Sequence, residues 1–170
     1  MSFKYSISPI TNNEYEIPEG GDSESLRSFI KENEGKKIVV VQGLGFVGTV
    51  MSLVVANSNE NEYAVIGIDQ QDPNSYWKIG DINEGRLPLV SSDPKVAEYF
   101  HKTLQKNNFM ATFDSEAFSY ADVIIVDINL DVVKRKDSNE NITSYSVPLE
   151  GFKKAMQSIG LKLFAKNGFG

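Results

Sequence analysis

The sequence predicts an α/β fold in which a parallel sheet is covered by helices. Apolar runs rich in β-branched residues recur along the chain, as expected for strands buried on both faces; they span residues 38–41, 63–69 and 122–128. Segments with apolar residues at helical spacing separate these runs. Strands that alternate with helices in this way form parallel sheets through right-handed crossovers.

Residues 1–35 are expected to form an extension before this fold. Loop-forming residues such as Pro18 punctuate its first part, which predicts a loop or an irregular strand. A short helix is expected after it, because Leu26, Phe29 and Ile30 recur at helical spacing.

The remaining elements follow from the alternation of apolar runs and turn residues. Asp93 followed by Pro94 predicts a helix start, since aspartate caps helices well and proline suits the first helical position. The expected order is helix 46–56, strand 63–69, short helix 76–82, the helix opened by Asp93, strand 109–112, helix 115–120, strand 122–128, a polar loop over 131–144 and a last helix from Pro148.

A complete G-x-G-x-x-G follows the first predicted strand and opens the next helix. In a dinucleotide-binding turn, Gly43 would permit the tight turn, Gly45 would let a pyrophosphate approach the backbone, and Gly48 would let the helix pack on the strand. The N–H groups of Phe46 and Val47 would face the phosphates at the positive end of the helix dipole. A turn needed only for packing is the alternative reading.

Asp69 ends the second predicted strand, about 20 residues past the glycine turn. A carboxylate there accepts hydrogen bonds from the adenosine ribose hydroxyls, or caps a nearby turn. It would repel a 2′-phosphate, and residues 70–72 supply no arginine to hold one, so NAD is favoured over NADP. Together with the glycine turn, this predicts a Rossmann-type parallel sheet in the order 3-2-1-4, with flanking helices and an N-terminal helical extension.

Composition excludes several functional classes. The 170 residues carry a net charge of −6 and no cysteine. Nucleic-acid binding by charge, thiolate metal sites and cysteine nucleophiles are therefore not expected. Neither a spanning segment nor a signal peptide is evident, so no membrane association and a cytoplasmic location are expected. Asp127 and Asp131 lack a third ligand, so no metal site is expected.

Several segments in order resemble the N-terminal NAD-binding domain of the UDP-glucose/GDP-mannose dehydrogenase family. The stretch Asn83-Glu84-Gly85-Arg86-Leu87-Pro88 matches a diagnostic Asn-x-Gly-x-x-Pro pattern of that family. Lys78 falls where the family carries a basic residue near the adenosine ribose. The other matching segments are residues 37–48, 68–69, 111–114 and 121–126.

This resemblance implies the cofactor half of a nucleotide-sugar 6-dehydrogenase, an enzyme of polysaccharide precursor synthesis. Such enzymes oxidise a sugar C6 alcohol to a carboxylate with NAD, through an aldehyde held on a cysteine. Residues 36–170 would then be an incomplete dinucleotide-binding domain. The nucleotide sugar would bind a C-terminal domain that this sequence does not contain, and no catalytic residue is expected here. The chain departs from the family pattern at residues 90–93 and 129–130, and in a longer loop after Asp69.

Two other functions stay open. The absent cysteine is compatible with a non-catalytic Rossmann module that senses a dinucleotide or mediates assembly. A β-hydroxyacid type of dehydrogenase, which shares this domain, is a third reading. Only four strands are evident, so the strand at residues 122–128 should lie at a sheet edge. Such an edge predicts a homo-oligomer, or the helix from Pro148 packed across it.

Overall fold

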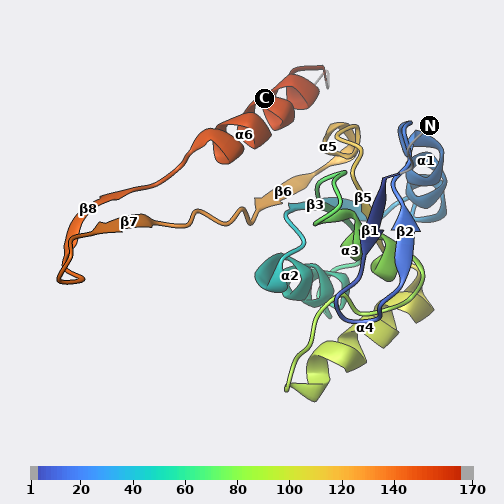
Figure 1. Ribbon diagram of the computed structural model, residues 1–170. Helices are drawn as coiled ribbons and strands as arrows, with labels where there is room; N and C mark the ends of the chain where they lie inside the picture. The colour runs from blue at the N-terminus through green and yellow to red at the C-terminus, as the bar shows by residue number, and fades with distance from the viewer. Residues whose placement is uncertain (1–3, 166–170) are drawn as a thin grey trace. The chain divides into compact units, whose positions relative to one another are not determined.

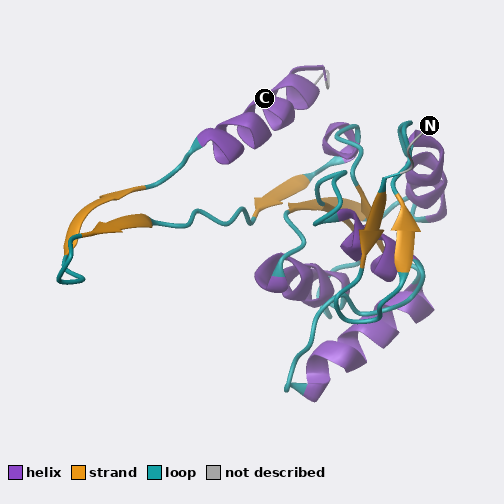
Figure 2. Ribbon diagram, viewed as in Figure 1, coloured by secondary structure: helices purple, strands orange, loops and turns teal. Residues whose placement is uncertain are grey.

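The computed structural model describes residues 4–165, in two compact units. The first unit spans Met1–Asp127 and the second Ile128–Gly170. Figure 1 follows the elements along the chain, and Figure 2 shows that strands and helices alternate through most of the first unit.

The first unit contains a four-stranded parallel sheet. Its strands are β3 (Lys37–Gln42), β4 (Tyr63–Ile68), β5 (Phe109–Thr112) and β6 (Val123–Val126). They lie in the order β5-β4-β3-β6, which corresponds to the predicted 3-2-1-4. The α/β fold class is confirmed. The strand β6 lies at one edge of this sheet, as the sequence predicted.

Helices connect these strands close to the predicted positions. They are α2 (Phe46–Ala56), α3 (Tyr76–Asn83), α4 (Pro94–Lys106) and α5 (Ala117–Tyr120). Asp93 caps α4 as expected, because its Oδ1 accepts the Lys95 N–H at 2.9 Å.

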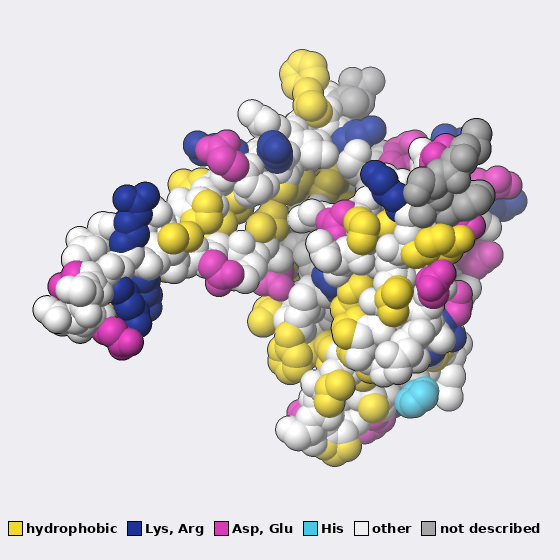
Figure 3. All heavy atoms as spheres, viewed as in Figure 1, with side chains coloured by type: hydrophobic (Ala, Val, Ile, Leu, Met, Phe, Trp, Pro, Cys, Tyr) yellow, Lys and Arg dark blue, Asp and Glu magenta, His cyan; other side chains and the backbone are white. Residues whose placement is uncertain are grey.

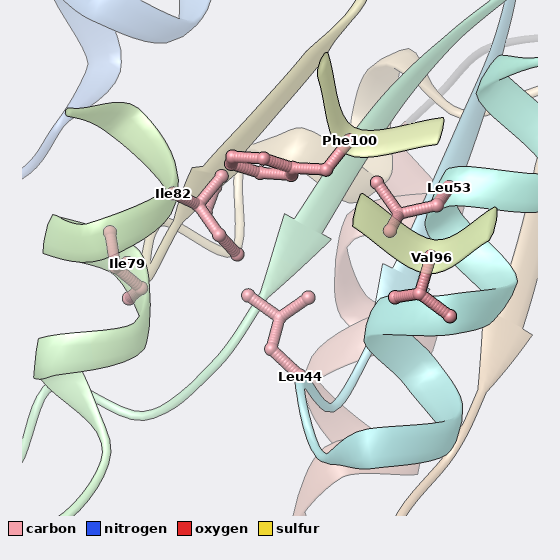
Figure 4. Packing of buried hydrophobic residues seen from close by; sticks show 7 residues of the cluster. Leu44, Leu53, Ile79, Ile82, Val96 and Phe100 are labelled. Carbon is pink, nitrogen blue, oxygen red and sulfur yellow. The ribbon is translucent and has the colours of Figure 1, made fainter. Parts of the chain in front are cut away.

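One apolar cluster joins α2, α3 and α4 to the sheet. Figure 4 shows Leu44, from the turn after β3, between Ile79 and Ile82 of α3 and the helices α2 and α4. Leu44 is 1% exposed, so its side chain anchors the turn in the core. Its methyl groups occupy the space beside Gly67, where a Cβ would lie 2.4 Å from Leu44 Cδ2.

The extension before the sheet is more ordered than the sequence predicted. Strands β1 (Tyr5–Ile7) and β2 (Glu14–Glu16) pair antiparallel, where a loop or irregular strand was expected. Each strand has only three residues and buries only its central one, so alternation was too short to detect. The predicted helix is present as α1 (Ser23–Glu32), with Leu26 and Phe29 buried.

The second unit corrects the prediction of a polar loop at residues 131–144. A hairpin of β7 (Val133–Lys136) and β8 (Ile142–Ser146) occupies that stretch, and α6 (Glu150–Ala165) follows it. The Asp137 carboxylate organises the hairpin turn by accepting the N–H groups of Asn139 and Asn141 at 2.8 and 2.9 Å. These backbone hydrogen bonds lower the pKa of Asp137. Lys and Arg side chains gather on this hairpin (Figure 3), and that polarity concealed the strands in the sequence.

Candidate functional site

Two close backbone approaches shape the glycine turn, one against Asp127, the residue after β6, and one within the turn itself. Gly43 has φ +101°, and a Cβ there would lie 1.9 Å from the Asp127 carbonyl oxygen. A Cβ on Gly48 would lie 1.9 Å from the Gly43 carbonyl oxygen. Both positions therefore require glycine for the turn itself, whether or not a ligand binds.

Gly45 differs, because nothing in the described chain constrains it. A Cβ on Gly45 would meet no atom within 4 Å, and its backbone is extended, with φ −69°. The absent side chain leaves open space directly over the first turn of α2. A pyrophosphate that approaches this turn would occupy that space.

The first turn of α2 presents backbone donors beside this open space. Gly45 is the residue before the helix, and within the described residues no side chain caps this end. The first N–H groups of a helix have no acceptor within the helix, so those of Phe46 and Val47 remain available to an anion. Both side chains are 58% exposed. The positive end of the helix dipole adds to the attraction for a phosphate.

Asp69 ties the end of β4 to the glycine turn. Its carboxylate is almost buried, at 8% exposure for the residue. Oδ2 accepts the backbone N–H of Leu44 at 3.1 Å, and Oδ1 accepts the backbone N–H of Gln70 at 2.8 Å. The acidic residue and the glycine turn are thus brought together at the carboxyl end of the sheet, where Rossmann-type folds bind their ligands.

Lys78 reaches the same carboxylate from α3. Its Nζ donates to Asp69 Oδ2 at 2.5 Å, and its side chain is 18% exposed. The positive charge of Lys78 offsets the free-energy cost of burying the charged Asp69 carboxylate. Side by side, the carboxylate can accept a hydrogen bond and the ammonium can donate one.

Asn83, the first residue of the Asn-x-Gly-x-x-Pro stretch, has a structural role at the end of α3. Its Nδ2 donates to the Ala111 carbonyl, and its Oδ1 accepts the Ala111 N–H, both at 2.8 Å. The side chain therefore pairs with β5 as a neighbouring strand would. A diagnostic pattern can thus mark the attachment of α3 to the sheet rather than a ligand contact.

Asp127 is a residue whose position sequence reasoning missed. In the sequence it was considered only with Asp131, as a pair too small to bind a metal. In the structure its backbone lies against Gly43, and its N–H donates to the Gln42 carbonyl at 2.8 Å. Its Oδ2 would lie 3.0 Å from a Cβ on Gly48. Asp127 directly follows β6, the strand beside β3, and ligands of such sheets bind at the carboxyl ends of the strands. That position was the signal that could have identified it.

The described residues also bear on metals and membranes. Within residues 4–165, no three His, Asp or Glu side chains are grouped so as to hold a metal ion. Over the same residues, no helix has the length and apolar character needed to cross a membrane.

Comparisons with known proteins place this domain in a family and give a structural neighbour. Residues 36–162 match the model of the UDP-glucose/GDP-mannose dehydrogenase family, NAD binding domain. A search of curated proteins found no match. Among solved structures, the chain resembles NDP-N-acetyl-D-galactosaminuronic acid dehydrogenase from Methanosarcina mazei Go1, with a TM-score of 0.63 and 23% identity. That match covers 81% of this chain and 27% of the archaeal one, so the chain spans about a quarter of that protein's length.

Proposed function

The chain belongs to the UDP-glucose/GDP-mannose dehydrogenase family and contains its NAD-binding domain, and on that premise we propose how it holds the cofactor. The pyrophosphate binds over Gly45, against the N–H groups of Phe46 and Val47. The adenosine ribose binds at Asp69 and Lys78. The observation that carries this proposal is a contrast within the turn. Backbone atoms occupy the space where a side chain of Gly43 or Gly48 would lie, whereas the corresponding space beside Gly45 is open.

The pair of Asp69 and Lys78 gives the ribose site its chemistry. The carboxylate accepts a hydroxyl hydrogen, and the lysine Nζ, 2.5 Å from Oδ2, donates to a hydroxyl oxygen. A 2′-phosphate would meet the carboxylate, which disfavours NADP. Within the described residues 70–72, Gln70, Gln71 and Asp72 offer no cation to compensate for it.

The reaction we infer for the whole protein is oxidation of a nucleotide sugar at C6 to a uronic acid. NAD supplies the hydride acceptor in this reaction. The chain's own residues bind and orient that cofactor, while the family's covalent step on a cysteine needs a residue that these 170 residues do not include. The neighbouring solved structure is named as a uronic acid dehydrogenase, which supports this substrate class. A cytoplasmic role in making polysaccharide precursors is part of the same proposal.

A non-catalytic module is the second candidate, because the chain has no cysteine. It would bind a dinucleotide at the same site as a sensor or an assembly domain. The mass of the native protein that carries this segment distinguishes the dehydrogenase from the non-catalytic module. A mass several times 18.9 kDa, with a cysteine-containing second domain, supports the dehydrogenase, whereas a native protein of 18.9 kDa supports the module.

The experiment that tests the ribose assignment is a titration of NAD and NADP into the wild-type chain and the Asp69→Ala variant. We expect NAD to bind about tenfold more weakly to the variant, because hydrogen bonds to a charged acceptor are lost. The preference for NAD should also narrow, since Lys78 is released towards a 2′-phosphate. Glu60→Ala, which removes an exposed carboxylate of the same unit, should leave both affinities unchanged. Equal affinities in wild type and Asp69→Ala would refute the assignment.

A further inference from the structure

An N-terminal arm, residues 4–18, lies outside the segment that matches the family model and packs against α3. Figure 1 shows β1 and β2 beside α3, the helix that carries Lys78. Two hydroxyl side chains of the arm, Ser6 and Ser8, have no exposed surface, and Tyr15 is 8% exposed. All three side chains direct their polar atoms to α3 or to the residues just before it.

Ser6 supplies the N-terminal cap that α3 lacks in its own sequence. Ser75, the residue before the helix, makes no side-chain cap hydrogen bond. Instead, the Trp77 N–H donates to Ser6 Oγ at 2.8 Å, and Ser6 Oγ donates to the Pro73 carbonyl at 2.8 Å. Trp77 is the second residue of α3, a position whose N–H is usually accepted by the helix's own cap. The arm therefore holds the first turn of α3 at Trp77, the residue directly before Lys78.

A buried carboxylate holds the arm to the middle of the same helix. Asp81 has no exposed surface, and it accepts hydrogen bonds from Ser8 Oγ and Tyr15 OH, each at 2.6 Å. The Tyr15 ring lies so close to Gly80 that a Cβ there would be 2.4 Å from its Cδ1. Asp81 Oδ1 also accepts from Thr11 Oγ1 at 3.1 Å and pairs with Arg86 Nε at 3.3 Å. Loss of the arm's donors from a buried carboxylate is destabilising, so the arm contributes to holding α3 in place.

The arm also reaches the loop that precedes α3. The Gln71 side-chain amide donates to the Pro18 carbonyl. Gln71 follows Asp69 by two residues, in the loop that leads to α3. The arm thus contacts the segment that connects Asp69 and Lys78 at several points, and it contacts α3 again beyond Lys78, at Asp81.

We propose that the N-terminal arm is a positioning element for the adenosine end of the cofactor site, acting through Lys78. Ser6 and the Asp81 contacts hold α3 in the place from which Lys78 Nζ reaches Asp69 Oδ2 at 2.5 Å. Ser6 and Tyr15 are positioning residues, since neither side chain contacts the glycine turn or Asp69 in the described hydrogen bonds. The inference rests on the proposed function, in which Lys78 donates to the ribose.

The test is a double-mutant cycle on NAD affinity in the full chain, with Ser6→Ala and Lys78→Met. Ser6→Ala should weaken NAD binding about fivefold. This is the change in affinity expected if the free energy of one helix cap is lost from the NAD-binding conformation. In the Lys78→Met background the same change should have no further effect on affinity, because the residue through which it acts is gone. Ser25→Ala, which removes an exposed serine of α1, is the matched control and should bind NAD like wild type. Tyr15→Phe provides a second arm variant, with the same expected coupling to Lys78.

The outcomes separate this inference from the proposed function. If Ser6→Ala and Tyr15→Phe lower the melting temperature but leave NAD affinity unchanged, the arm is only structural and the inference is wrong. An equal loss of affinity with and without Lys78 would also overturn it. If Lys78→Met alone binds NAD like wild type, the ribose assignment of Lys78 fails, and the inference fails with it. Wild-type binding that is weakened by Asp69→Ala would still support the rest of the proposed function in that case.

Discussion

At the residue scale, the three glycines of the turn have different physical reasons for being glycine. Gly43 and Gly48 are required by the fold, since a Cβ at either position would overlap a backbone carbonyl. Gly45 is required only if something binds over it, because a side chain there would extend into open space. Sequence reasoning assigned the three roles from the pattern alone. The geometry explains why Gly43 and Gly48 are glycine, whereas the role of Gly45 in binding stays a prediction.

Substitution of Gly43 should therefore destabilise the protein. Gly43→Ala places a Cβ 1.9 Å from the Asp127 carbonyl oxygen in a residue with φ +101°, so we expect a loss of more than about 2 kcal/mol in the free energy of unfolding. Urea unfolding followed by circular dichroism measures it. Gly20→Ala, where a Cβ meets nothing within 4 Å, is the matched control and should change stability little. Equal stability of the two variants would show that the turn relaxes without cost.

At the element scale, the contact between the arm and α3 should respond to pH. Burial raises the pKa of Tyr15 above its ordinary value of 10.0, and the neighbouring Asp81 raises it further, although a hydrogen bond from Arg86 lowers it. The folded state thus favours the neutral phenol. This contribution to stability is fully present below the unfolded value and is lost as the pH rises through the folded pKa.

The prediction is that, as the pH rises past the ordinary tyrosine pKa of 10.0, the urea midpoint falls more steeply in wild type than in Tyr15→Phe. The phenylalanine variant lacks the group that has to ionise. Tyr145→Phe removes a tyrosine that is 77% exposed, and it should retain the wild-type slope. A Tyr15→Phe slope equal to that of wild type would mean that the phenol does not ionise on unfolding.

The elements also show what a single sequence can and cannot reveal. Strands β3, β4 and β6 were evident because each is a continuous apolar run. The hairpin of β1 and β2 was missed because each strand has three residues, and β7 because all of its residues are charged or exposed. The close approach of Gly43 to the Asp127 carbonyl was missed as well. The hydrogen bond that the Trp77 N–H donates to Ser6 Oγ joins residues too far apart in sequence to infer.

At the scale of the whole molecule, the edge strand β6 predicts association. It pairs only with β3 among the described strands, and Val123 is 46% exposed. An unpaired apolar edge is a template for another chain. Light scattering should therefore give a mass above 18.9 kDa that rises with concentration. A monodisperse 18.9 kDa species, together with slow amide exchange along β6 and no helix against that edge, would contradict this.

The most direct test of the central claim is a calorimetric titration of NAD into the wild-type chain and into Gly45→Leu. The leucine side chain would fill the open space over the first turn of α2 without meeting any described atom within 4 Å at its Cβ. We expect wild type to bind NAD and Gly45→Leu to show no binding heat, with both chains unfolding at the same urea concentration. Gly20→Leu should bind like wild type. NAD binding to Gly45→Leu with unchanged affinity would contradict the placement of the pyrophosphate over this turn.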